Sequence, residues 1–197
     1  MTLAVTTEPA IEPISLDEAK AHLRVDHSEE DLLIERLVTA ARRTVERWEW
    51  RTHYTTTYTL YLDAFDTEDG IIYLPRPPLQ SITSVKYYDP DDTLQTWASS
   101  NYEVDTSMHP GRLRPVSTVT WPTTDDRLNA VEIEYVAGYT TAALVPANTR
   151  AAILLLVDHY FNNRGVMTTI QESEPPEHML GLLDRCKDHR VLAFVYW

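Results

Sequence analysis

The sequence predicts an α+β fold: an N-terminal helical hairpin, a small central antiparallel β unit, C-terminal helices and an extended apolar C-terminal tail. Three observations lead to this prediction. Apolar residues recur at helical spacing in residues 14–52, alternate with polar residues in residues 53–140, and return to helical spacing in residues 141–188. Residues 1–13 read as an N-terminal arm and residues 189–197 as the tail. A chain of 197 residues with 43% hydrophobic residues suits a single domain.

The hairpin begins with a capping box, Ser15-Leu16-Asp17-Glu18. We expect the Ser15 hydroxyl to accept from the amide of Glu18, and the Glu18 side chain to reach back. Ser28 is expected to cap a second helix that runs to about Trp50. Its apolar stripe has helical spacing and comprises Leu33, Leu37, Ala41, Val45 and Trp48. The opposite face carries Arg36, Arg43 and Arg47. We expect this face either to be exposed to solvent or to contact another subunit.

The middle of the chain is predicted to form a series of short strands. Threonine alternates with tyrosine and leucine from Tyr54, and turn signals such as Asp69-Gly70 and His109-Pro110-Gly111 separate the segments. The expected strands lie within residues 54–62, 70–75, 81–89, 101–105, 111–115 and 130–139. In this region Pro75, Pro77 and Pro78 come directly before a strand, where we expect them to hold the chain extended and to blunt the edge of that strand.

A third helix is expected from Pro146 to Gly165, and its apolar centre predicts a buried spine. A last short helix is expected from about Pro176 to Lys187. The tail that follows is strongly apolar, although chain ends usually fray unless something holds them. It is therefore expected either to fold back on its own core or to dock on a partner.

Composition excludes several classes of protein. The formal net charge is -13 and the pI is about 4.8, so a basic face for specific DNA binding is not expected. The acidity serves either solubility or a surface that repels nucleic acid. The single cysteine, Cys186, provides no disulfide framework. No signal peptide or membrane span is expected, which predicts an intracellular protein without membrane contact.

No pattern of catalytic residues is recognisable. The sequence contains no nucleophile elbow, P-loop or H-E-x-x-H motif, and Cys186 has no identifiable histidine partner. We therefore expect no enzyme, no cofactor and no metal. A weaker alternative is a metal-dependent enzyme that uses the acidic cluster Asp63, Asp66, Glu68 and Asp69, although the cluster does not fit a calcium-binding EF-hand loop.

The order of motifs resembles the head–tail connector (adaptor) family of long-tailed bacteriophages and gene transfer agents. The motifs are, in order, "SLDEAKAHLRVD", "AARRTVERW", "LPRPPLQSITSVKYYD", "NYEVD", "WP", "VEIEYVAGY" and "VPANTRAAILLLVDHYFNNR". They span residues 14–164, which is most of the chain. The remainder of the chain carries no such motif.

This resemblance implies a structural protein of the virion head–tail junction, made in the cytoplasm of the host bacterium. Connector subunits form a dodecameric ring beneath the portal protein, extend the DNA channel without binding DNA specifically, and provide a platform for stopper or tail-completion proteins. The implied subunit interface would use Arg36, Arg43, Arg47, Pro77 and Pro78. The implied portal contact would use four residues of the tail, Leu192, Phe194, Tyr196 and Trp197.

A different class of function also fits the acidity. A DNA mimic that inhibits a DNA-binding enzyme presents carboxylates at phosphate spacing on one face. In this chain the acidic residues are interspersed with basic ones along the whole length, which favours the connector.

Overall fold

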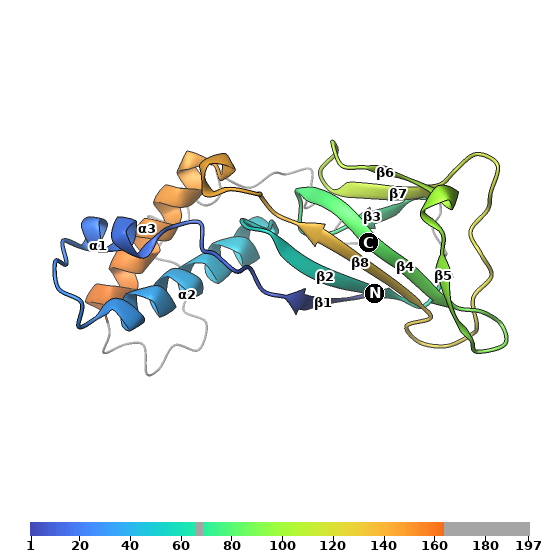
Figure 1. The fold of residues 1–197 in the computed structure, drawn as a ribbon, viewed down its shortest axis with the longest axis horizontal. Helices are drawn as coiled ribbons and strands as arrows, with labels where there is room; N and C mark the ends of the chain where they lie inside the picture. The colour runs from blue at the N-terminus through green and yellow to red at the C-terminus, as the bar shows by residue number, and fades with distance from the viewer. Residues whose placement is uncertain (66–68, 164–197) are drawn as a thin grey trace. The chain divides into compact units, whose positions relative to one another are not determined.

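The computed structural model describes residues 1–65 and 69–163 and divides the chain into two compact units. Among the described residues, the helical unit comprises residues 11–54 and 140–163, and the sheet unit comprises residues 1–10 and 55–139. Figure 1 shows helices α1–α3 in the first unit and strands β1–β8 in the second. The predicted α+β fold is confirmed.

Three helices form the helical unit: α1 (Leu16–Leu23), α2 (Asp31–Glu49) and α3 (Ala147–Asn162). A short 3-10 turn, Ala142–Leu144, precedes α3. Helices α1 and α3 both pack on α2, and the apolar side chains between them are removed from water, which is the main stabilising term in such a unit. The fully buried core comprises Ile14, Ala19, Ile34, Leu37, Val38, Ala41, Val45, Ala152, Ile153, Leu156 and Val157.

The ends of α1 and α2 differ in part from the predictions. Ser15 caps α1 as predicted, because its Oγ accepts from the Glu18 N–H at 3.2 Å. The Glu18 carboxylate does not accept from the Ser15 N–H, as a capping box requires. It accepts instead from Arg150 at 2.7 Å and so ties α1 to α3. The prediction of a Ser28 cap is wrong: α2 begins after Glu30, whose side chain makes no capping hydrogen bond.

Helix α3 is less enclosed than predicted. Pro146 stands at its N-cap position, and Ala152, Ile153 and Leu156 face the core. However, Leu155 is exposed, so α3 buries one face rather than its whole circumference. The predicted end of the helix at Gly165, the last helix and the apolar tail lie outside the described residues.

The sheet unit contains two antiparallel sheets. The first has the strand order β1-β2-β8-β4-β5, and the second has the order β3-β7-β6. The strands are β1 (Thr2–Thr7), β2 (Thr56–Leu62), β3 (Ile72–Leu74), β4 (Leu79–Tyr88), β5 (Leu94–Trp97), β6 (Tyr102–Asp105), β7 (Gly111–Pro115) and β8 (Val131–Ala137). Six of them match predicted strands. Strands β1 and β5 were missed, and β1 lies in the segment expected to be an arm.

The core of this unit combines aliphatic residues with an aromatic cluster. Phe65 stacks on Trp121 with ring centroids 4.6 Å apart, and Trp121 lies 4.9 Å from Trp97. The Trp121 indole donates to the carbonyl of Gly70 at 3.1 Å, which satisfies its polar atom. These contacts hold the loops that connect the two sheets.

The proline segment folds differently from the prediction. Residues 75–77 form a bend, Arg76 has a left-handed φ of 63°, and the Pro77–Pro78 peptide bond is cis, so the segment is a turn rather than an extended brace. The Pro75 carbonyl accepts from the Tyr135 hydroxyl at 2.8 Å. Strand β4 lies between β8 and β5, so the edges of its sheet are β1 and β5. The turn therefore organises the start of an inner strand.

No helix among the described residues is long and apolar enough to cross a membrane.

Candidate functional site

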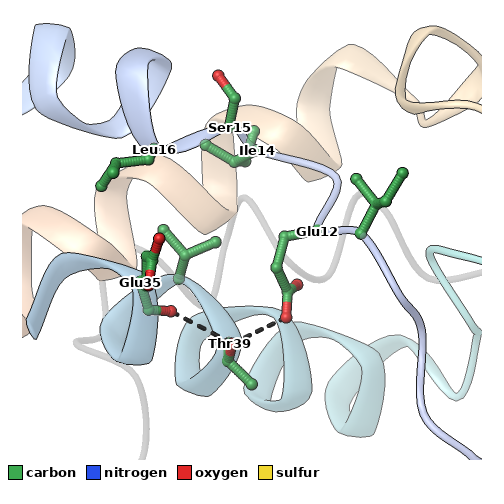
Figure 2. Close-up of a pocket in the computed structure, with 8 residues that line it drawn as sticks. Glu12, Ile14, Ser15, Leu16, Glu35 and Thr39 are labelled. Carbon is green, nitrogen blue, oxygen red and sulfur yellow. Dashed lines mark hydrogen bonds between the residues drawn. The ribbon is translucent and has the colours of Figure 1, made fainter. Parts of the chain in front are cut away.

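The helical unit carries a groove of about 390 Å³ between the segment that leads into α1 and the first half of α2. Figure 2 shows Ile14, Ser15 and Leu16 on one side and Glu35 and Thr39 of α2 on the other. The lining is mixed: the apolar residues are Ile11, Ile14, Leu16 and Val38, and the polar ones are Glu12, Ser15, Glu35 and Thr39. Apolar side chains beside a few fixed polar groups are typical of a binding surface.

Glu12 is fixed at one end of this groove. Its Oε1 accepts from the Thr39 hydroxyl at 2.8 Å, and its Oε2 accepts from Arg42 Nε at 2.7 Å. The Thr39 hydroxyl also lies 3.2 Å from the carbonyl of Glu35 (Figure 2). Because these bonds come from two successive turns of α2, they hold the residues before α1 against that helix.

The Arg42 side chain continues inward as a buried ion network. It is only 3% exposed and also donates through Nη1 to Glu46 Oε2 at 2.7 Å. The other oxygen of Glu46 accepts from the backbone N–H of His53 at 2.8 Å. His53 Nε2 lies 2.7 Å from Glu49 Oε2, and the Thr149 hydroxyl donates to Glu49 Oε1 at 3.2 Å. The network therefore ties the end of α2 to the start of α3.

The sequence did not reveal this network as a unit. Arg42 and Glu46 are four residues apart within α2, which is the spacing that brings side chains together on a helix. Glu49 and His53 have the same spacing, but His53 lies beyond the end of α2. Charged residues at that spacing are also common on the exposed face of a helix. The sequence therefore predicts a buried network only when it is known which face of α2 is buried. Glu12 lies 30 positions from Arg42 in the chain, and no local pattern links them.

The three arginines predicted for a subunit contact, Arg36, Arg43 and Arg47, are all exposed on α2. Their predicted position on the face away from the core is confirmed, and their role in an interface stays a prediction. Of the two prolines predicted for the same interface, Pro77 is buried in the sheet unit and Pro78 is half-buried. The structure does not bring these prolines together with the arginines in one unit. The predicted portal contact, Leu192, Phe194, Tyr196 and Trp197, lies outside the described residues.

The alternative metal site is not formed by the acidic residues that the structure describes. Asp63 accepts from the backbone of Asn129 at 2.8 Å, and Asp69 accepts from Ile71 N and from the Tyr73 hydroxyl, both at 3.0 Å. Asp66 and Glu68 lie outside the described residues. Within residues 1–65 and 69–163, no group of three or more potential ligands could hold a metal ion.

A second groove, of about 220 Å³, lies beside β6 and β7 in the sheet unit, and its charges are neutralised in pairs. Arg112 binds Asp105 at 2.9 Å, and Arg114 binds Glu103 at 2.8 Å. The Ser107 hydroxyl, Arg112 and the Ser107 N–H, in that order of strength, lower the pKa of Asp105 to about 2. Asp105 therefore carries its negative charge down to strongly acidic pH.

Most of the excess negative charge belongs to the sheet unit. Residues 1–10 and 55–139 contain fourteen acidic and five basic residues. A group of aspartates lies at the end of the first sheet where β2 and β4 end and β8 begins, since Leu62 and Tyr87 both pair with Val131. This group, the acidic end, comprises Asp63, Asp89, Asp91, Asp92, Asp125 and Asp126. Arg127 binds Asp92 at 2.6 Å and covers the Tyr88 ring.

Comparison with models of known protein families shows to which family the chain belongs. The family model for the head completion protein (HCP) matches residues 12–171, which include the ion network, the groove lining except Ile11, and every strand except β1. The chain belongs to the head completion protein family. The resemblance to the head–tail connector (adaptor) family of phages and gene transfer agents is therefore confirmed. No curated protein matches the chain.

Solved structures share the fold of this head completion protein. One comes from the neck of an empty gene transfer agent (GTA) particle computed with C6 symmetry, with a TM-score of 0.76 and 18% identity. A second comes from the virion of a native GTA particle, with a TM-score of 0.76 and 19% identity. A third comes from the neck of a native GTA particle computed with C12 symmetry, with a TM-score of 0.74 and 18% identity. Each match covers 95% of both chains.

Proposed function

We propose that this protein is a structural subunit of the head–tail junction, located in the virion, and that it acts by assembly rather than by catalysis. The match of the head completion family to residues 12–171 carries this proposal. The fold shared with proteins of GTA necks and a GTA virion supports it. The role would be to complete a DNA-filled head and to give the tail a surface on which to attach.

In this proposal the subunits form a dodecameric ring beneath the portal protein, and stopper or tail-completion proteins bind the ring. The C6 and C12 symmetries of the related neck structures support a ring of this kind. Exposed Arg36, Arg43 and Arg47 suit a contact between subunits, because arginine is favoured at protein interfaces. Pro77 offers little surface to such a contact, and Pro78 offers more.

DNA would pass through the ring without specific binding. The net charge of -13 supports this part of the proposal, because carboxylates repel phosphates and keep them from settling on the wall. The acidic end of the sheet unit concentrates such charge. Three of its aspartates, Asp63, Asp89 and Asp92, already form hydrogen bonds or an ion pair with neighbouring residues, so they do not present bare carboxylates in place of DNA phosphates. This engagement weighs against the alternative of a DNA mimic.

The test of the proposal is electron microscopy of particles made when the gene is deleted. We expect capsids without tails together with free tails, and restoration of joined particles when the wild-type gene is supplied in trans. Joined particles in the deletion would overturn the connector function. Tight binding of the purified protein to a DNA-processing enzyme would then support the DNA mimic.

The apolar tail is proposed to contact the portal protein through Leu192, Phe194, Tyr196 and Trp197. Aromatic anchors of this kind supply much of the energy of an interface. Removal of residues 191–197 should abolish binding to purified portal protein and leave the circular dichroism spectrum of the monomer unchanged. Loss of the folded spectrum would show that the tail belongs to the core, and retained binding would place the portal contact elsewhere.

A further inference from the structure

We infer that the groove of one subunit receives Leu32 and Arg36 from helix α2 of the next subunit, so that identical copies associate head to tail. This inference rests on the proposed function, because it names the surfaces through which the ring would close. It concerns residues of the helical unit only.

The groove is acidic as well as apolar. Glu35 at its rim is exposed, and its carboxylate forms no hydrogen bond or ion pair with residues 1–65 or 69–163. Glu12 is already bonded to Thr39 and Arg42, which holds its carboxylate in place. Ile11, at the same rim, is 62% exposed although it is a large aliphatic residue. The groove therefore fits a partner that carries an aliphatic group beside a cation.

Helix α2 presents that combination directly beside the groove, because Leu32 lies three residues before Glu35. Leu32 is 71% exposed, and Arg36 lies four residues further on, so the two side chains are neighbours on one helical face. Arg36 forms no hydrogen bond or ion pair with the described part of the chain. Guanidinium groups bind carboxylates with two parallel hydrogen bonds, which gives such a contact a defined geometry. The pair Leu32 and Arg36 is thus complementary to Ile11 and Glu35.

A ring requires that the contact join two different surfaces of the subunit, here the groove and the pair Leu32 and Arg36. Glu35 and Thr39 line the groove, and Leu32 and Arg36 lie next to them on α2 without lining it. A surface and its complement at different positions on one molecule make a heterologous contact, and such contacts close into rings when the rotation between copies permits. Apolar contact with Ile11 would supply affinity, and the charge pair would set the register.

Charge reversal on each side of the contact tests this inference. Sedimentation velocity of purified full-length protein, extended to millimolar concentration, should show self-association of the wild type. Glu35→Arg and Arg36→Glu should each weaken it about ten-fold or more, because each places like charges together. An equimolar mixture of the two variants should restore association, since every groove then meets a residue of opposite charge.

Glu29→Arg and Arg24→Glu are matched controls, because both residues are exposed in the helical unit and neither lines the groove. The controls should associate like the wild type. The inference is overturned if the wild type stays monomeric throughout, if the groove variants associate normally, or if the controls lose association equally. Weaker portal binding by Glu35→Arg with unchanged self-association would overturn it as well and assign the groove to the portal protein.

A crosslinking experiment tests the head-to-tail geometry. In a Cys186→Ser background, the double variant Ile11→Cys and Leu32→Cys is treated with a short bifunctional maleimide. A ladder of trimers and larger products supports the inference, because each copy then uses two different surfaces. Products no larger than dimers, or products equal to those of the single-cysteine variants, would contradict it.

The failure of this inference and that of the proposed function give different results. If gene deletion separates heads from tails but both association tests fail, the function stands and the ring uses other surfaces. If deletion leaves joined particles, the function itself fails, whatever the purified protein does.

Discussion

Gly111, the first residue of β7, makes space for Leu79 at the start of β4. A Cβ atom at this position would lie 2.5 Å from Leu79 Cδ2 and 2.6 Å from Leu79 Cβ. Because the nearer atoms belong to a buried side chain, we expect Gly111→Ala to destabilise the protein by about 1–3 kcal/mol. Urea denaturation measures this change. In a background of Leu79→Ala the same substitution should cost much less, and an equal cost would show that the clash is not the cause.

Arg42 is the centre of the ion network, and its loss would remove the cation that binds the carboxylates of Glu12 and Glu46. Removal of one member of a buried ion pair typically costs about 3–5 kcal/mol. We therefore expect Arg42→Ala to lower the free energy of unfolding by that amount. Urea denaturation followed by circular dichroism at 222 nm measures this change. Arg114→Ala is the control, because the Arg114 side chain is 63% exposed and exposed pairs contribute about 0–1 kcal/mol. Equal losses would contradict a special role for the network.

Asp105 predicts a pH dependence in the sheet unit. Its pKa is lowered to about 2 in the folded protein, chiefly by the hydroxyl of Ser107 and then by Arg112, from an ordinary value of 3.8. A lowered folded pKa stabilises the protein above pH 4, and this contribution is lost as the pH falls from about 4 to about 2. Asp105→Asn should flatten the stability profile in this interval. A stability profile of Asp105→Asn that falls as steeply as that of the wild type in this interval would contradict the prediction.

At the scale of elements, strand β1 makes an edge that the sequence did not predict. It pairs with β2 from Thr2↔Tyr61 to Thr7↔Thr57, and Leu3 packs against the core of the sheet unit. Removal of residues 1–8 should expose the β2 edge and lower the melting temperature by about 5 °C or more, the shift for a loss of about 1 kcal/mol in a unit of this size. Thr2→Ala, which keeps the backbone pairing, should have little effect. An unchanged melting temperature would show that β1 does not stabilise the sheet unit.

The elements that the sequence predicted correctly are those with strong local signals. Ser15 caps α1 through an interaction across three residues, and the long alternation before Ala137 marks β8. Strand β1 was missed because a short apolar alternation near a chain end also fits a flexible arm. The proline turn was misread because Arg76 adopts a left-handed φ, which is uncommon for residues other than glycine. The groove was missed because it joins Glu12 to α2, and only the folded unit brings them together.

At the scale of the whole molecule, assembly must overcome repulsion between copies that each carry a net charge of -13. The screening length is about 30 Å at 0.01 M salt, about 10 Å at 0.1 M and about 3 Å at 1 M. Repulsion between whole subunits acts over the longer of these distances and is therefore reduced first. The proposed pair between Arg36 and Glu35 acts at contact distance, and an exposed pair of this kind contributes only about 0–1 kcal/mol.

These magnitudes predict the salt dependence of self-association. We expect association to strengthen between about 0.01 M and about 0.1 M salt and then to change little, because long-range repulsion outweighs a single contact pair at low salt. Sedimentation velocity at the three salt concentrations measures this. Arg36→Lys keeps the charge and should reproduce the rise, whereas Arg36→Glu should associate weakly at every concentration. A steady weakening from the lowest salt upward would mean that ion pairs, rather than apolar contact against net repulsion, control how the subunits meet.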